Sequence, residues 1–142
     1  MNLLTLRISR SLKALLALVV FGLCGASYAE VVLIVSSKSS VGALSKDEVK
    51  KIYLLKSKKL TPLVLKSSMA AHAEFRDKVI SKTESQLTSY WSRLVFSGRG
   101  EAPKEFSDED SMVKHVKSNS ETIGYVTRKS VTSGVKVVLT VP

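Results

Sequence analysis

Two serine-rich segments carry the side chains of this sequence that are best suited to bind a ligand. The first is Ser36-Ser37-Lys38-Ser39-Ser40 and the second is Lys66-Ser67-Ser68. Hydroxyl groups and the backbone amides at a helix start donate hydrogen bonds to oxyanions, and lysine adds positive charge. The sequence therefore predicts a site for a small oxyanion such as phosphate, formed by Ser36, Ser37, Lys66, Ser67 and Ser68. The alternative, which stays open, is that these serines only cap helices and solubilise loops.

Residue types and spacing give little support to other chemistry. Neither His72 nor His115 is accompanied by further ligands at metal-binding spacing, so we expect both on the surface and no metal or other cofactor. The sequence lacks the Gly-x-Ser-x-Gly motif of serine hydrolases. The single cysteine, Cys24, lies in a segment that we expect to be removed. We therefore expect a binding protein and not an enzyme.

Each serine-rich segment follows a predicted β-strand. Residues 31–35 are five consecutive apolar residues, which is typical of a strand buried on both faces. Residues 60–65 form a second, largely apolar run. In an open α/β sheet, ligands bind beyond the carboxyl ends of the strands, where loops lead into helices. We therefore expect the two serine-rich loops to lie side by side at one edge of the sheet.

The remaining chain alternates between helical and strand patterns. Ser45 with Glu48 is a capping box that starts one helix. A second helix is predicted at 69–80 after Ser67 or Ser68, and others start at Thr83 or Ser85 and at Ser107 with Asp110; strands are predicted at 122–126 and 135–141. This alternation predicts an α/β fold, a single three-layer domain with a mostly parallel sheet flanked by helices.

The N-terminus has the three parts of a secretory signal peptide. Arg7, Arg10 and Lys13 make it positive, an apolar run follows at 14–23, and small residues precede a cleavage site near Ala29. The run is shorter than the about 20 residues that a spanning helix needs. We therefore expect a signal peptide at 1–29, a domain at 30–142, a periplasmic location and no stable membrane span after cleavage.

The net charge of the expected mature chain favours some classes of partner over others. Three of the 22 basic residues leave with the signal peptide. The mature chain then has 19 basic and 12 acidic residues, and its net charge is +7. For an exported protein, anionic solutes or envelope components are better candidates than nucleic acid, and no nucleic-acid-binding motif is present. A basic face is predicted from Lys56, Lys58, Lys59, Arg99 and Lys104, although such charges are often simply solvated.

Three segments resemble a known family, the short phosphate-transporter substrate-binding-like proteins. They are Leu44-Ser45-Lys46-Asp47-Glu48 with Ile52-Tyr53, then the run from Tyr90-Trp91-Ser92 to Gly98-Arg99-Gly100, and Ile123-Gly124-Tyr125-Val126. The family comprises small relatives of the phosphate-binding protein of an ABC transporter. The resemblance covers nearly all of the mature chain and implies a type II periplasmic-binding-protein-like lobe that binds phosphate or a similar oxyanion. The expected macromolecular partner is an ABC transporter permease or another envelope protein.

One departure from the family bears on the ligand. In the family the second helix opens with Ser-Gly-Thr, and an arginine stands four residues earlier. Counted back from Phe75, these positions hold Met69-Ala70-Ala71 and Leu65, none of which offers a side-chain donor. The sequence therefore keeps a second hypothesis open, in which the same fold has lost its ligand site and serves as a non-catalytic module that binds another envelope protein.

Overall fold

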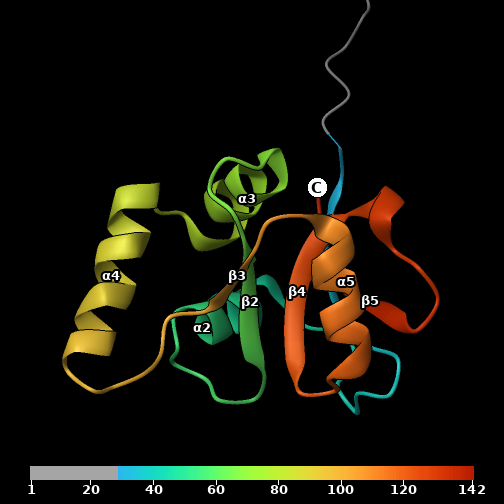
Figure 1. The fold of residues 1–142 in the computed structure, drawn as a ribbon, viewed down its shortest axis with the longest axis horizontal. Helices are drawn as coiled ribbons and strands as arrows, with labels where there is room; N and C mark the ends of the chain where they lie inside the picture. The colour runs from blue at the N-terminus through green and yellow to red at the C-terminus, as the bar shows by residue number, and fades with distance from the viewer. Residues whose placement is uncertain (1–28) are drawn as a thin grey trace, which may run out of the picture.

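A computed structural model describes residues 29–142, which form one five-stranded sheet in the order β3-β2-β4-β1-β5 (Figure 1). The strands are β1 (Val31–Ser36), β2 (Thr61–Leu65), β3 (Lys104–Phe106), β4 (Thr122–Thr127) and β5 (Val135–Val141). The predicted α/β class is confirmed. The sheet is mixed, because β2 pairs in parallel with β3 and β4, whereas β1 pairs antiparallel with β4 and β5. Four strands thus share one direction, and β1 opposes them.

Helices cover both faces of this sheet. They are α2 (Lys46–Tyr53), α3 (Ala70–Phe75) with the π-helical segment Arg76–Ile80, α4 (Glu84–Phe96), α5 (Glu109–Ser118) and a 3-10 turn at Arg128–Ser130. Figure 1 shows α5 in front of β4, α2 behind β2, and α4 at the side of the sheet where β3 lies. Successive residues of β4 point to opposite faces: Gly124 faces Met112 of α5, and Tyr125 stacks on Phe75 of α3 at 4.0 Å between ring centroids.

Most helix starts follow the local sequence. The predicted capping box of Ser45 and Glu48 is present, and Thr83 forms a second one with Gln86. Two starts were predicted wrongly. The cap of α5 is Asp108, which accepts from the amide of Ser111, and α3 begins after Met69 without any side-chain cap. Ser67 and Ser68 therefore cap no helix.

The core forms around β1, whose six residues are all buried. This strand lies inside the sheet with helices on both faces, which explains its unbroken run of apolar residues. The three-residue strand β3 was not predicted, because Lys104-Glu105-Phe106 has no strand pattern of its own. Within residues 29–142, no helix is both long and apolar enough to cross a membrane. The predicted signal peptide falls on residues 1–28 and Ala29, and so lies almost wholly outside the described residues.

Candidate functional site

The two serine-rich loops lie at opposite edges of the sheet, in the sense that one follows the strand ends on one side and the other follows the strand ends on the opposite side. Val35 of β1 pairs with Ile123 near the start of β4, and Thr61 at the start of β2 pairs with Thr122. The end of β1 therefore lies level with the start of β2, with β4 between them. The end of β2, Leu65, lies four residues after Thr61, which is about 13 Å at 3.3 Å per residue. The prediction that the two loops lie side by side is wrong, because an apolar run does not reveal the direction in which its strand runs.

The first loop is closed by its own hydrogen bonds. Ser36 is 1% exposed, and its Oγ donates to the carbonyl of Lys117 at 3.4 Å and accepts from the amide of Lys38 at 3.2 Å. The amide of Ser37 donates to the carbonyl of Gly134 at 3.0 Å. The Ser36 hydroxyl and the Ser37 amide are therefore occupied, and only the exposed Ser37 hydroxyl is left, so the first loop lacks the group of free donors that the prediction required.

The second loop is open. Lys66, Ser67 and Ser68 are exposed beyond the end of β2. The amide of Lys66 donates to the carbonyl of Phe106 at 2.9 Å, which continues the β2–β3 ladder. Within residues 29–142, no hydrogen bond uses the amide or hydroxyl of Ser67 or Ser68. Of the predicted site, this loop alone keeps both amide and hydroxyl donors that face solvent.

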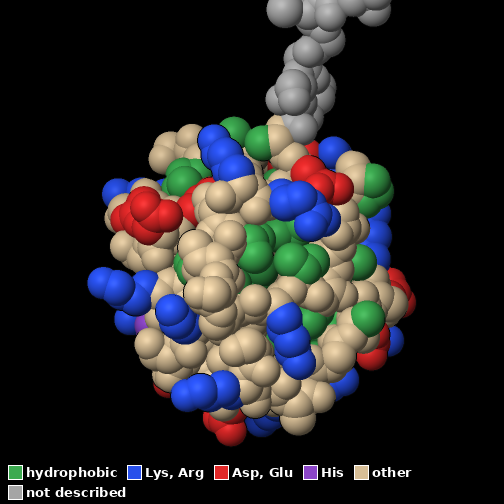
Figure 2. Space-filling view, turned by 90° about the vertical axis from the view of Figure 1, so that its right-hand side faces the viewer, with side chains coloured by type: hydrophobic (Ala, Val, Ile, Leu, Met, Phe, Trp, Pro, Cys, Tyr) green, Lys and Arg blue, Asp and Glu red, His purple; other side chains and the backbone are tan. Residues whose placement is uncertain are grey.

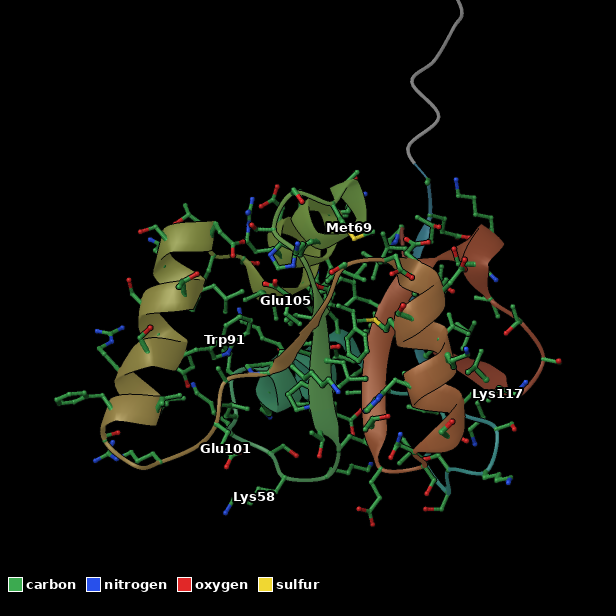
Figure 3. All side chains as sticks on the ribbon, viewed as in Figure 1. Lys58, Met69, Trp91, Glu101, Glu105 and Lys117 are labelled. Carbon is green, nitrogen blue, oxygen red and sulfur yellow. The ribbon has the colours of Figure 1, made fainter. Side chains whose placement is uncertain are left out.

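Acidic side chains lie at the same edge as this loop. The strand β3 ends beside the end of β2 and leads directly into α5, so Glu105, Asp108 and Asp110 are exposed there. Figure 3 shows Met69 at the upper end of the sheet, above Glu105. Negative charge near the loop opposes anion binding, and Lys66 is the only cation that the loop itself contributes.

A buried chain of polar groups lies directly below the second loop. The amide of Leu65 donates to the Tyr125 oxygen at 3.0 Å, and that phenol lies 2.6 Å from Nδ1 of His72. The Nε2 atom of His72 lies 2.6 Å from Oε2 of Glu84, which also accepts from Arg76 at 3.2 Å. If the phenol donates to Nδ1 and Nε2–H donates to the carboxylate, every member of the chain has a partner.

Burial and charge set the protonation of the tyrosine and the glutamate in this hydrogen-bond chain. Burial raises the pKa of the Tyr125 phenol, so the phenol stays a neutral donor. Partial burial alone would raise the pKa of Glu84, but the hydrogen bonds from His72 and Arg76 and the positive charge of Arg76 outweigh it and leave that pKa below its usual value. His72 is only 2% exposed, which closes its ring nitrogens to a substrate. These groups therefore join α3 to β4 and to the start of α4.

The burial of His72 corrects the expectation of a surface residue. His72 lies three residues before Phe75 and seven before Val79, both buried, so it faces inward with them. That spacing was visible in the sequence, but its polar partners were not. His115 is half-buried, with its ring centroid 5.2 Å from that of Phe106.

The aromatic pair of the family-like segment anchors α4 to the end of α2. The hydroxyl of Tyr90 donates to the carbonyl of Leu54 at 2.6 Å, and Nε1 of Trp91 donates to the carbonyl of Tyr53 at 2.9 Å. A helix end leaves its last carbonyl groups without helical partners. The side chains of Tyr90 and Trp91 donate to two of these carbonyl groups at the end of α2. The prediction that Trp91 belongs to the core is confirmed, while Tyr90 is half-buried.

The predicted basic face is assembled in part. Lys58, Arg99 and Lys104 line one hollow of about 420 Å³ at the edge where β2 begins, far from the second loop. On the β5 side of the molecule, by contrast, Lys and Arg side chains are scattered around an apolar area (Figure 2). Three of the five residues of the predicted basic face thus lie together at the hollow.

Comparisons with known proteins identify the class of fold. No protein-family model matches this chain, and neither does any curated protein. An ABC-type phosphate transport receptor from Vibrio cholerae aligns with a TM-score of 0.61 and 14% identity over 77% of this chain and 45% of its own. A phosphate ABC transporter substrate-binding protein with bound phosphate from Clostridium perfringens aligns with a TM-score of 0.62 and 16% identity, over 77% and 44%.

PstS from Borrelia burgdorferi is also similar, with a TM-score of 0.58 and 12% identity over 77% of this chain and 46% of its own. The chain thus has the α/β fold of phosphate ABC transporter substrate-binding proteins, and it spans less than half the length of these three. At such low identities the similarity extends to the fold alone. The neighbours are binding proteins and not enzymes.

Proposed function

We propose that this chain is an exported, phosphate-binding-protein-like domain that binds phosphate or a similar small oxyanion weakly at Lys66, Ser67 and Ser68. The observation that carries the proposal is the open loop at the carboxyl end of β2, where the Ser67 and Ser68 donors face solvent. Ligands of open α/β sheets bind at this position. A fold neighbour from Clostridium perfringens is described with bound phosphate, which supports the choice of ligand.

The affinity is expected to be low because only one loop contributes. Three or four hydrogen bonds at a net 0.5–1.5 kcal/mol each sum to about 1.5–6 kcal/mol, which corresponds to a dissociation constant no tighter than about 40 μM and, at the middle of this range, of a few millimolar. The first loop lies at the far edge, and Glu105 and Asp108 repel anions at the near edge. A second lobe or a partner surface would be needed to close over the ligand.

Export and a transporter partner belong to the same proposal. A signal peptide at 1–29 would direct the domain at 30–142 to the periplasm, where an ABC transporter permease or another envelope protein would be its partner. The positive N-terminus, the apolar run at 14–23 and the small residues before Glu30 support this. No reaction is proposed, because the only buried histidine is closed to substrates.

The second candidate function is an interaction module that has lost its ligand site. Met69-Ala70-Ala71 offers no hydroxyl where the family has Ser-Gly-Thr, and the side chain of Phe96 is 97% exposed. Large exposed apolar side chains in an otherwise well-packed protein often mark contact surfaces. On this hypothesis the second loop binds no anion.

A titration of amide chemical shifts with phosphate and sulfate separates the two candidates. Oxyanion binding predicts saturable shifts at Ser67 and Ser68 in the millimolar range, absent with chloride at equal ionic strength. The K66Q/S68A double variant is expected to lose them. The matched control is K38Q/S40A, which changes the same residue types in the exposed part of the first loop. If no shift arises, or if both variants respond like the parent protein, the oxyanion proposal is wrong.

A further inference from the structure

The hollow at the far edge of the sheet lies between two loops. Its walls come from residues 55–62, which lead into β2, and from residues 99–104, which lead into β3. Leu55, Leu60 and Pro62 give it an apolar lining, while Lys58, Arg99 and Lys104 add charge. Figure 3 shows Lys58 and Glu101 together at the lower end of the molecule, away from Met69 and the second loop.

Prolines explain why the strands part here. The β2–β3 ladder begins at Leu63 and Lys104 and does not extend to the preceding residues, Pro62 and Pro103. Neither proline has an amide hydrogen to donate, so the two chains diverge before the ladder starts. The hollow is therefore built into the backbone and does not depend on one side-chain conformation.

Glycines complete the wall on the α4 side. Gly98 has a φ of +69° and ends α4, with its amide donating to the carbonyl of Val95. Gly100 lies against Leu55, since a Cβ atom at Gly100 would be 3.1 Å from the Leu55 Cδ1 atom. The Gly98-Arg99-Gly100 motif thus turns the chain tightly and holds Arg99 at the hollow.

The charges at the hollow are unbalanced. Its three cations face one carboxylate, Glu101. Among the ion pairs of residues 29–142, none involves Lys58, Arg99 or Lys104. Unpaired cations around an apolar floor favour a partner that brings carboxylates together with an apolar side chain.

A protruding aromatic side chain lies at the C-terminal end of α4, outside the residues that line the hollow. Phe96 is 97% exposed and Val95 47% exposed, in the last turn of α4 and three to four residues before Arg99. Tyr90 and Trp91 bind this helix to α2, so Phe96 is presented on an anchored element. Anchored aromatic residues next to arginine are typical of the centres of protein interfaces.

We propose that Phe96, Arg99, Lys58, Lys104 and the apolar hollow form a docking surface for an acidic segment of another protein that carries an apolar side chain. A second copy of this chain is disfavoured, because it would bring the same cations face to face. A membrane is disfavoured, because a flat surface does not reach the recessed apolar floor. The surface lies at the opposite edge from Lys66–Ser68, so the proposal is independent of oxyanion binding.

A phage-displayed library of random dodecapeptides, selected on the purified protein, tests the partner chemistry. Selected peptides are expected to be enriched in Asp and Glu next to an apolar residue, and to shift the amide signals of residues 55–61 and 99–104. The R99E/K104E variant and the F96S variant are each expected to bind them about tenfold more weakly or worse. The control K114E/K129E changes the net charge equally at exposed lysines elsewhere, and is expected to bind like the parent protein.

Each other outcome overturns the proposal. Failure to select peptides, peptides without acidic enrichment, or equal loss in K114E/K129E would show that the hollow recognises no acidic segment. Binding to phosphatidylethanolamine–phosphatidylglycerol vesicles that depends on Phe96, with no peptide selected, would identify a membrane surface instead. Circular dichroism of each variant verifies folding. A negative result in the peptide selection does not bear on oxyanion binding, which the phosphate titration of Ser67 and Ser68 tests separately.

Discussion

The phenol of Tyr125 and the imidazole of His72 lie 2.6 Å apart in the core, although 53 residues separate them in the chain. Because the amide of Leu65 also donates to this phenol, one hydroxyl joins β4, α3 and the end of β2. The loop Lys66–Ser68 follows Leu65 directly. Its position therefore depends on a buried hydrogen-bond chain as well as on the sheet.

Removal of the Tyr125 hydroxyl is expected to destabilise the protein. The Y125F variant leaves the amide of Leu65 and Nδ1 of His72 without their partner, which costs about 1–3 kcal/mol for buried groups. Urea unfolding measures the loss. Y90F is the comparison, since it removes one bond at a half-buried site and is expected to cost about 0.5–1.5 kcal/mol. Equal losses would contradict the special role of the buried phenol.

The ionised carboxylate of Glu84 is expected to stabilise the fold above the usual pKa of glutamate. Its pKa is lowered in the folded protein, so its contribution is present at neutral pH and is lost as the pH falls through that lower value. The free energy of unfolding of the parent protein should therefore exceed that of E84Q at pH 7, and the difference should shrink in acid. Glu101→Gln, at an exposed carboxylate, serves as control. A pH-independent difference would refute the assignment.

The glycine of the Ile-Gly-Tyr-Val strand is expected to be required by packing. A Cβ atom at Gly124 would lie 2.8 Å from Sδ and 3.0 Å from Cγ of Met112. G124A should therefore lower the free energy of unfolding by about 1–3 kcal/mol through overpacking. Gly42 has open space around it and no positive φ, so G42A should change stability by less than about 1 kcal/mol. Thermal unfolding of both variants checks this, and a tolerated G124A would contradict it.

Two aromatic residues of α4, Trp91 and Phe96, are expected to differ sharply in their contribution to stability. W91F removes the donor to the carbonyl of Tyr53 at a residue that is 9% exposed, and should cost about 1–3 kcal/mol. F96S alters a side chain that is 97% exposed, and should stay within about 0.5 kcal/mol. Denaturant titrations compare them. A large loss in F96S would mean that Phe96 packs within the fold and does not serve docking.

Export is expected to release a chain that starts at Glu30. When the full sequence is expressed in a Gram-negative host, mass spectrometry of the osmotic-shock fraction should find this N-terminus. A29D, which places a charge at the cleavage site, should retain the uncleaved chain in the membrane fraction. Full-length protein in the cytosol would contradict the predicted signal peptide.

Local patterns were sufficient to predict most elements and the class of fold. The unbroken apolar run at 31–35 indicated a strand buried on both faces, and capping residues located the helices that begin after Ser45 and Thr83. Such features depend on residues a few positions apart, so sequence displays them directly. The short strand β3 was missed because it forms only by pairing with β2, which is a contact between distant parts of the sequence.

The candidate site, in contrast, was decided by the tertiary structure. Strand β1 runs antiparallel to β4, which sends Ser36 and Ser37 to the opposite edge from Lys66, Ser67 and Ser68. The contact of His72 with Tyr125 joins residues 53 positions apart, and the cluster of Lys58, Arg99 and Lys104 depends on loops about forty residues apart. Strand direction and contacts between distant residues arise only when the chain packs, because side-chain periodicity is the same for either direction of a strand.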